Sequence, residues 1–235
     1  MEEIDEGYKI LAYIDDLEDV YRVAGKRNLS EALLRDINSL RQDIAELEPV
    51  LSTENAYGYF DAEVEGLIDG LMENCREGDE KSISNMVEEI QKRVTASRIR
   101  FGLGKARSLI NGNGFTLIST ADEKGTANTA FAGSATIIDD ERMAVIQLGL
   151  GKTIENLNHN KNATVIGFKI NKENPMATEI ARVYLTLIGD EDSGSLFEQM
   201  KEGLKRQAGE SVAGMMQRVC VFKIEDIRIS IPPTM

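Results

Sequence analysis

Residues 115–160 read FTLISTADEKGTANTAFAGSATIIDDERMAVIQLGLGKTIENLNHN, and their apolar side chains are spaced differently from those that precede them. Upstream, apolar residues recur every three or four positions, which is typical of helices. Within this stretch they follow the two-residue alternation of strands, and turn-forming residues separate the segments. In chain order the stretch predicts strands at 115–120, 126–138 and 143–148, with turns at 122–125 and 139–141, and then a short helix at 153–160.

The strand pattern continues beyond this stretch. Strands are predicted at 163–170, 180–189 and 218–231. Between the last two, Ser195-Leu196-Phe197-Glu198 fits the capping box of a helix that runs to about Gln207. Six mostly antiparallel strands with two short helices predict a small closed barrel.

Residues 1–97 are predicted to be helical throughout. Ser30 and Asp79 are candidate N-caps, and Pro49 is predicted to end the second helix. A further helical stretch is predicted from about Arg98 to Leu109. Four amphipathic helices with short connections indicate an antiparallel bundle, so the fold class is α+β. The four apolar stripes are Tyr8, Leu11, Ile14, Leu17 and Tyr21; Leu33, Leu34, Ile37, Leu40, Ile44 and Leu47; Phe60, Val64, Leu67, Ile68, Leu71 and Cys75; and Ile83, Met86, Val87, Ile90 and Val94.

Charge also divides the chain into two parts, with the boundary after Ser97. Residues up to Ser97 include 24 acidic and 10 basic side chains, whereas the rest of the chain has 16 acidic and 17 basic ones. We therefore expect an acidic helical bundle at 1–97 and a second domain at 98–235. The acidic part should repel nucleic acid and anionic membranes, so neither is expected as a partner.

Several functional classes are excluded or disfavoured by composition. Cys75 and Cys220 are far apart and the chain has a single histidine, so a structural zinc site is excluded. No serine–histidine–aspartate arrangement can be built around His159, which we expect to be solvent-exposed. The acidic N-terminal sequence and the lack of an apolar run near the roughly 20 residues that span a bilayer favour a cytoplasmic protein.

The segment from Gln147 to Leu157 is the first candidate site. Gly149 and Gly151 allow a ligand to approach the backbone, and Lys152 and Thr153 follow where a helix is expected to begin. Free N–H groups at a helix start favour an anion such as phosphate. The nucleotide-binding P-loop pattern fails because position 146 is Ile. The alternative is that Thr153 only caps the helix and Lys152 is a solvated surface side chain.

The predicted strand at 126–138 is the second candidate site. Residues 127–135 carry almost no bulk on either face apart from Phe131, so a flat ligand could lie against them. The alternative is close packing of the strand against a helix, which also requires small residues.

In the order of its strands and in the pattern Gly-Lys-Thr-(x)3-Leu-(x)2-Asn, the chain resembles the FMN-binding split barrels of the pyridoxamine 5'-phosphate oxidase-related superfamily from about residue 102 to 233. The resemblance implies a six-stranded antiparallel split β-barrel with two short helices. In such proteins an arginine and a lysine often hold the phosphate at the positions of Lys152 and Thr153, so one cation is replaced by a hydroxyl here. The FMN-binding residues it implies are Asn128, Thr129, Ala130, Phe131, Ala132, Gly133, Ser134, Ala135, Ile146, Gln147, Lys152 and Thr153.

The resemblance also implies a homodimer with the flavin between subunits and a small-molecule substrate. The Arg-x-His element by which the true oxidase holds its substrate is absent from the sequence end, Ser230 to Met235, which disfavours vitamin B6 oxidation. We expect an FMN-dependent oxidoreductase, with Ser134 or Thr136 as donors that tune the flavin. The alternatives are a non-enzymatic flavin or phosphate-ligand sensor or store whose bundle binds a partner protein, and an empty barrel that only dimerises.

Overall fold

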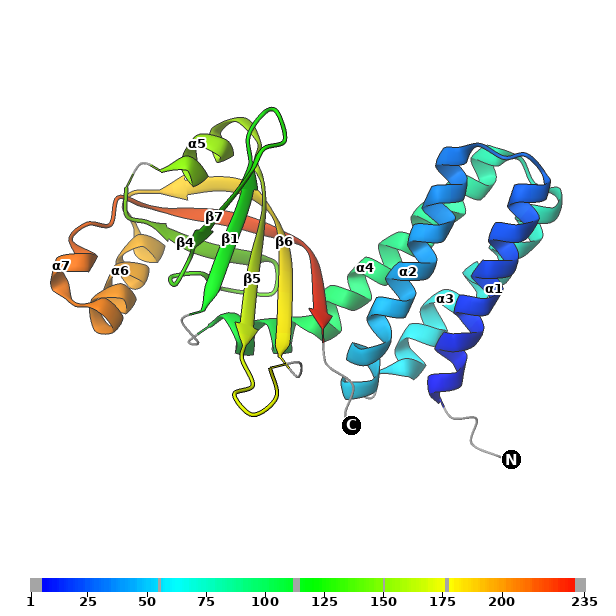
Figure 1. Ribbon diagram of the computed structural model, residues 1–235, viewed down its shortest axis with the longest axis horizontal. Coiled ribbons are helices and arrows are strands. Elements are labelled where there is room, and N and C mark those ends of the chain that lie inside the picture. Colours follow the sequence, from blue (N-terminus) through cyan, green and yellow to red (C-terminus); the bar gives the residue numbers. More distant parts are fainter. Residues whose placement is uncertain (1–5, 55, 112–114, 150, 176–177, 231–235) are drawn as a thin grey trace. The chain divides into compact units, whose positions relative to one another are not determined.

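The computed structural model describes residues 6–54, 56–111, 115–149, 151–175 and 178–230. The chain forms two compact units, Met1–Gly102 and Leu103–Met235 (Figure 1). None of the described helices is long and apolar enough to cross a membrane.

The first unit contains helices joined by short turns, as the apolar stripes predict. The stripes of the second, third and fourth helices are largely buried, and the half-buried members are Leu34, Leu67 and Met86. The fourth helix runs without interruption through the stretch predicted as a separate helix after Arg98. The helices are α1 (Glu6–Lys26), α2 (Glu31–Glu54), α3 (Tyr57–Glu77) and α4 (Glu80–Ile110), and α4 ends in the second unit.

The predicted stripe of α1 is wrong in phase, although its member Leu17 is buried as predicted. Leu11 and Tyr21 are 55% and 43% exposed, and Tyr8 lies outside the described side chains. The predicted positions advance mostly in steps of three, which drift around a helix of 3.6 residues per turn. The buried positions alternate steps of three and four and therefore stay on one face; they are Ile10, Tyr13, Leu17, Val20 and Ala24.

Pro49 does not end α2, contrary to the prediction. The helix continues to Glu54, and Val50 and Leu51 are buried. Burial of these two side chains offsets the hydrogen bond that proline cannot donate. The predicted caps are confirmed, because the Ser30 hydroxyl accepts a hydrogen bond from the N–H of Leu33 and the Asp79 carboxylate accepts one from the N–H of Ser82.

The second unit has an antiparallel sheet with seven strands in its described residues, in the order β2-β1-β5-β6-β7-β4-β3. The sheet is not closed, because among the described residues its edge strands β2 and β3 do not pair with each other. The strands are β1 (Thr116–Ala121), β2 (Ala127–Phe131), β3 (Thr136–Ile137), β4 (Arg142–Gln147), β5 (Asn162–Lys169), β6 (Glu179–Glu191) and β7 (Arg218–Ser230).

The predicted count of six strands in a closed barrel is therefore wrong. The single strand expected at 126–138 divides into β2 and β3 at a turn. In this turn the N–H of Ala135 donates to the carbonyl of Ala132, with Gly133 and Ser134 between them. Because the chain turns here, the two halves join opposite edges of the sheet.

The C-terminal end of α4 packs directly on the sheet. A Cβ atom added at Gly167 on β5 would lie 3.0 Å from the carbonyl oxygen of Leu109, so only glycine permits this approach. Asn111 both donates to and accepts from the main chain of Ile137 and so satisfies part of the β3 edge.

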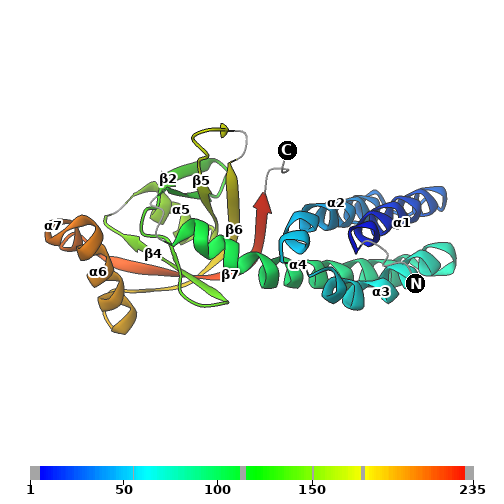
Figure 2. The same cartoon turned by 90° about the horizontal axis from the view of Figure 1, so that it is seen from below.

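Besides the end of α4, the helices among the described residues of this unit are α5 (Lys152–His159), α6 (Ser195–Ala208) and α7 (Glu210–Ala213). Figure 2 shows α6 and α7 side by side at one end of this unit. The capping box predicted from Ser195 is not formed, since Gly194 is the N-cap and makes no side-chain cap. Phe197 of α6 packs with Ala144 and Ile146 of β4 and with Val219 of β7. This packing places α6 against β4 and β7.

Candidate functional site

A cavity of about 610 Å³ lies where β2, the end of β4 and the start of α5 meet. Its volume falls within the roughly 300–1,000 Å³ typical of small-molecule sites. The structure brings ten of the twelve predicted site residues to its walls: Asn128, Ala130, Phe131, Ala132, Gly133, Ser134, Ile146, Gln147, Lys152 and Thr153.

The two other predicted residues do not line this cavity. Thr129 is exposed and its hydroxyl lies 3.0 Å from that of Ser119, because successive side chains of β2 point to opposite faces. Ala135 lies beyond the turn that ends β2. It is buried and lines a neighbouring cavity instead.

The start of α5 forms the polar corner of the cavity. Gly151 is the N-cap and makes no side-chain hydrogen bond to the first turn, so the N–H groups of Lys152 and Thr153 have no side-chain cap. A Cβ atom added at Gly149 or Gly151 would meet nothing within 4 Å. The corner therefore has uncapped donors and open space beside them, and the interpretation of Thr153 as a cap is wrong.

The Thr153 hydroxyl is held by a neighbouring strand. It accepts a hydrogen bond of 3.2 Å from the side-chain amide of Asn128 on β2. This bond occupies one of the two lone pairs of the hydroxyl, and the proton of the hydroxyl can be donated to a ligand.

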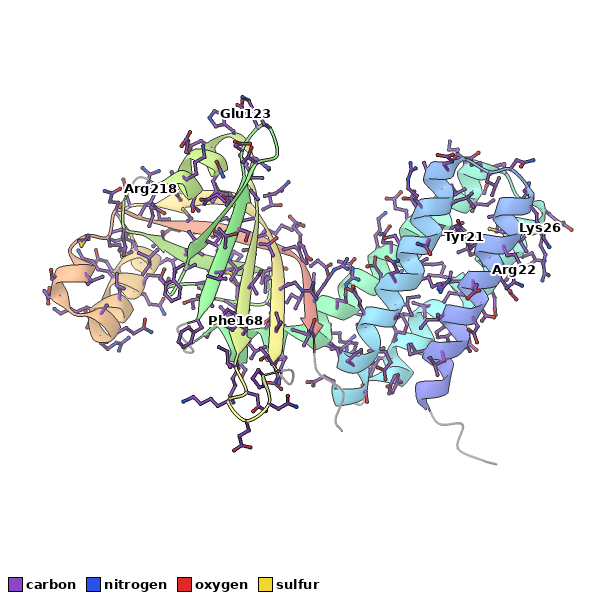
Figure 3. All side chains as sticks on the ribbon, in the orientation of Figure 1. Tyr21, Arg22, Lys26, Glu123, Phe168 and Arg218 are labelled. Atoms are coloured by element: carbon purple, nitrogen blue, oxygen red, sulfur yellow. The ribbon has the colours of Figure 1, made fainter. Side chains whose placement is uncertain are left out.

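Two further side chains of α5 attach the helix to β1 and the turn that follows it. Asn156 donates to the Thr120 hydroxyl over 3.1 Å, and His159 lies 2.7 Å from the Glu123 carboxylate. Figure 3 shows Glu123 at the turn that follows β1. Thr153, Asn156 and His159 follow one another in steps of three, so each contact neighbours the next along the surface of the helix. These contacts fix the position of the corner.

The walls of the cavity are positive or neutral. Lys152 lines it, half-exposed, and its ammonium group lies 3.2 Å from the carboxylate of Glu155. No acidic side chain and no histidine is among the described residues that line the cavity. Asp122 lies outside it, where hydrogen bonds from the main chain of Thr126, with a small contribution from the charge of Lys152, lower the pKa of its carboxyl. The local charge favours an anionic ligand.

Two candidate donors and the histidine have other roles. The Ser134 hydroxyl accepts a hydrogen bond of 3.0 Å from the N–H of Ile146, and the Thr136 hydroxyl donates to the carbonyl of Ser134. Both therefore serve the main chain at the turn between β2 and β3. His159 is exposed, as predicted, and does not line the cavity.

Some wall residues were not predicted from the sequence. Leu204, Gln207 and Ala208 come from α6, about fifty residues after the corner. The sequence signals an amphipathic helix there but not the wall on which it packs. Alternation along β1 could have indicated Ile118, but β4 is buried at four consecutive positions and gives no such signal for Val145; both residues complete the apolar side.

No protein-family model matches the chain, and no curated protein matches it. Solved structures do. An FMN-binding protein from Syntrophomonas wolfei subsp. wolfei is 27% identical, with a TM-score of 0.53 over 63% of this chain and 99% of its own. A putative pyridoxamine 5'-phosphate oxidase from Lactobacillus delbrueckii is 16% identical (TM-score 0.39, 51% and 89% covered). HutZ, a heme storage protein from Vibrio cholerae, is 17% identical (TM-score 0.41, 57% and 94% covered).

The open antiparallel sheet, with its cavity beside a glycine-flanked helix start, defines a split-barrel protein. The likeness to the FMN-binding protein confirms the resemblance to a split-barrel fold that is seen in the sequence.

Proposed function

We propose that the second unit binds FMN in the 610 Å³ cavity, with the phosphate at the corner formed by Gly149, Gly151, Lys152 and Thr153. The observation that carries the proposal is this corner: uncapped helix N–H groups, a lysine and an oriented hydroxyl face space that no side chain fills. An anion is favoured at such a helix start. The likeness to an FMN-binding protein supports the same ligand.

The rest of the cavity fits a flat, largely apolar ring system. Ala130 and Ala132 of β2 leave room, while Ile118, Val145 and Ile146 provide apolar surface. A bound flavin would supply the electron or hydride chemistry, and these residues would bind and orient it and exclude water. We infer that the protein is an FMN-dependent oxidoreductase acting on a small molecule.

We also infer a homodimer with the flavin at the subunit interface. Phe131 is 65% exposed and Leu148 is 39% exposed, yet both line the cavity. Exposed apolar side chains that gather at one place are typical of a surface that another molecule covers. A second copy of the chain would bury both and complete the wall.

A non-enzymatic flavin sensor or store is the second candidate. It is favoured by the lack of a carboxylate or histidine among the described wall residues, since proton transfer usually requires one. Anaerobic mixing of the FMN-loaded protein with NADH or NADPH separates the two candidates. An oxidoreductase should bleach the flavin absorbance within seconds, and admitting air should reoxidise the flavin and allow a further cycle while reduced nicotinamide remains. A store should show no bleaching within that time.

A comparison of FMN with riboflavin, which lacks the phosphate, tests the assignment of the corner. Fluorescence titration should show FMN binding at least about tenfold more tightly, because a hydrogen bond to a charged group contributes roughly 1.5–3 kcal/mol. Equal affinities would contradict the phosphate assignment, and failure of both ligands to bind would contradict the proposed function.

A further inference from the structure

Helix α5 is joined to the hairpin of β1 and β2 by two hydrogen bonds that run in opposite directions. The side-chain amide of Asn156 on α5 donates to the hydroxyl of Thr120 on β1 over 3.1 Å. The side-chain amide of Asn128 on β2 donates to the hydroxyl of Thr153 on α5 over 3.2 Å. We call these four residues the asparagine–threonine clamp.

The backbone places the four residues of the clamp side by side. Thr120 and Asn128 lie directly opposite each other in the antiparallel pairing of β1 and β2, so their side chains are neighbours on one face of the hairpin. Thr153 and Asn156 are neighbours one turn apart on α5. Each strand residue thus contacts one helix residue, and the clamp holds α5 to the hairpin at two points.

The bond between Asn156 and Thr120 is the buried half of the clamp. Asn156 is 1% exposed and Thr120 is 4% exposed. Neither residue lines the proposed flavin cavity, whereas Asn128 and Thr153 both do. The buried pair can therefore influence a bound ligand only through the elements that it joins.

Packing alone does not explain an asparagine at position 156. The buried residues beside it on α5, Ile154 and Leu157, are apolar. The side-chain oxygen of Asn156 is buried and has no hydrogen-bond partner within the described ranges of the chain. A buried acceptor without a partner destabilises the fold, and an apolar side chain of similar size would avoid this cost. What asparagine supplies here and leucine could not is the N–H donor to Thr120.

The clamp connects the two parts of the proposed flavin site. Strand β2 provides Ala130 and Ala132 for the ring system, and α5 provides the uncapped N–H groups of Lys152 and Thr153 for the phosphate. A ligand with both a ring and a phosphate gains both contacts only if the spacing of the two parts matches its own length.

We propose that Asn156 and Thr120 are positioning residues for phosphate selectivity: their buried hydrogen bond holds the start of α5 at the distance from β2 that a phosphorylated flavin requires. This inference rests on the proposed function, because the phosphate corner is the part of the site that the clamp positions. Breaking the bond should weaken binding of the phosphate and leave binding of the ring system unchanged.

Fluorescence titration with FMN and with riboflavin, on two variants of Thr120, tests this role. Thr120→Val keeps the shape of the side chain and removes the hydroxyl, whereas Thr120→Ser keeps the hydroxyl and removes a methyl group. Ser119→Ala is the matched control. The Ser119 hydroxyl lies 3.0 Å from that of Thr129, so it joins the same two strands on their opposite face.

Thr120→Val should weaken FMN binding about tenfold, as expected when a hydrogen bond to a charged group is lost, and should change riboflavin binding by less than about twofold. Thr120→Ser and Ser119→Ala should change either affinity by less than about twofold. Asn156→Leu should reproduce the loss seen in Thr120→Val. The double variant should lose no more than either single variant, because both changes break the same bond.

A purely structural role would give the reverse order for Thr120, since serine leaves a gap in a buried position and valine does not. The proposal would be overturned if Thr120→Ser weakened FMN binding more than Thr120→Val did. It would also be overturned if FMN and riboflavin were weakened by the same factor, or if no variant changed either affinity.

The proposed function and the clamp can fail separately. If the wild-type protein bound neither flavin, the flavin proposal would be wrong, and NMR titration with inorganic phosphate would decide the role of the clamp. Phosphate should then shift the amide signals of Lys152 and Thr153 in the wild-type protein and in Thr120→Ser, and less in Thr120→Val. Equal shifts in all three proteins, or no shift in any of them, would overturn the clamp as well.

Discussion

Replacement of Lys152 by alanine should weaken FMN binding roughly tenfold without affecting riboflavin. The side chain of Lys152 is 48% exposed, and its ammonium group also pairs with the Glu155 carboxylate at 3.2 Å. Water and this carboxylate would therefore partly screen its interaction with a phosphate. We therefore take the lower end of the range for a charged hydrogen bond, about 1.5 kcal/mol, which corresponds to roughly tenfold in affinity.

Replacement of Glu155 by glutamine should have the opposite effect. An exposed ion pair of this kind contributes about 0–1 kcal/mol, so freeing Lys152 from it should tighten FMN binding by up to about fivefold. Both changes should lose much of their effect at high salt, because the groups are half-exposed.

Fluorescence quenching of free FMN and of riboflavin measures both effects. Lys161→Ala is the matched control, since this exposed lysine follows α5 and does not line the cavity. The reasoning would be refuted if Lys152→Ala left FMN affinity unchanged, or if it weakened riboflavin and FMN by the same factor.

Arg98 and Asp43 form a buried ion pair of 2.9 Å in the helical unit, and Arg98→Ala would leave the carboxylate buried without its partner. Urea unfolding should therefore show a free energy of unfolding lower by about 3–5 kcal/mol. A loss below about 1 kcal/mol would contradict the burial of the pair. Residues 1–97 are predicted to fold alone, and circular dichroism should find both a 1–97 and a 1–102 fragment helical. The longer fragment should have the higher melting temperature, because it retains Arg98. A non-helical 1–102 fragment would refute an independently folding bundle. Burial raises the pKa of Cys220 to about 11, so a thiol reagent at pH 8 should label this residue only after unfolding. Between pH 9 and 11 the thiol of Cys220 loses its proton in the unfolded chain and keeps it in the native protein, so the free energy of unfolding should fall as the pH rises. Rapid labelling of the native protein, or a free energy of unfolding that does not change over this pH range, would contradict the raised pKa.

The local sequence was sufficient to predict the polar corner of the cavity. Gly149, Gly151, Lys152 and Thr153 are adjacent in the chain, and a strand end followed by a helix start places them together whatever the rest of the fold does. The apolar stripes of α2, α3 and α4 were predictable for the same reason, because their spacing matches the helical period over many turns.

Long-range packing was not predictable in the same way. Whether residues 126–138 form one strand or two depends on which edge of the sheet each half joins, and no local pattern encodes that choice. The contribution of α6 to the cavity wall depends on Phe197 packing over β4 and β7. In α1, several phases of the apolar pattern were compatible with the sequence, and burial against neighbouring helices selected one.

A crystal structure of the protein grown with FMN would test the central claim most directly. The account predicts phosphate oxygens within about 3 Å of the main-chain nitrogens of Lys152 and Thr153, with the ring system against Ala130 and Ala132 of β2. Density for FMN at another place, or a corner that holds only water at saturating FMN, would contradict it.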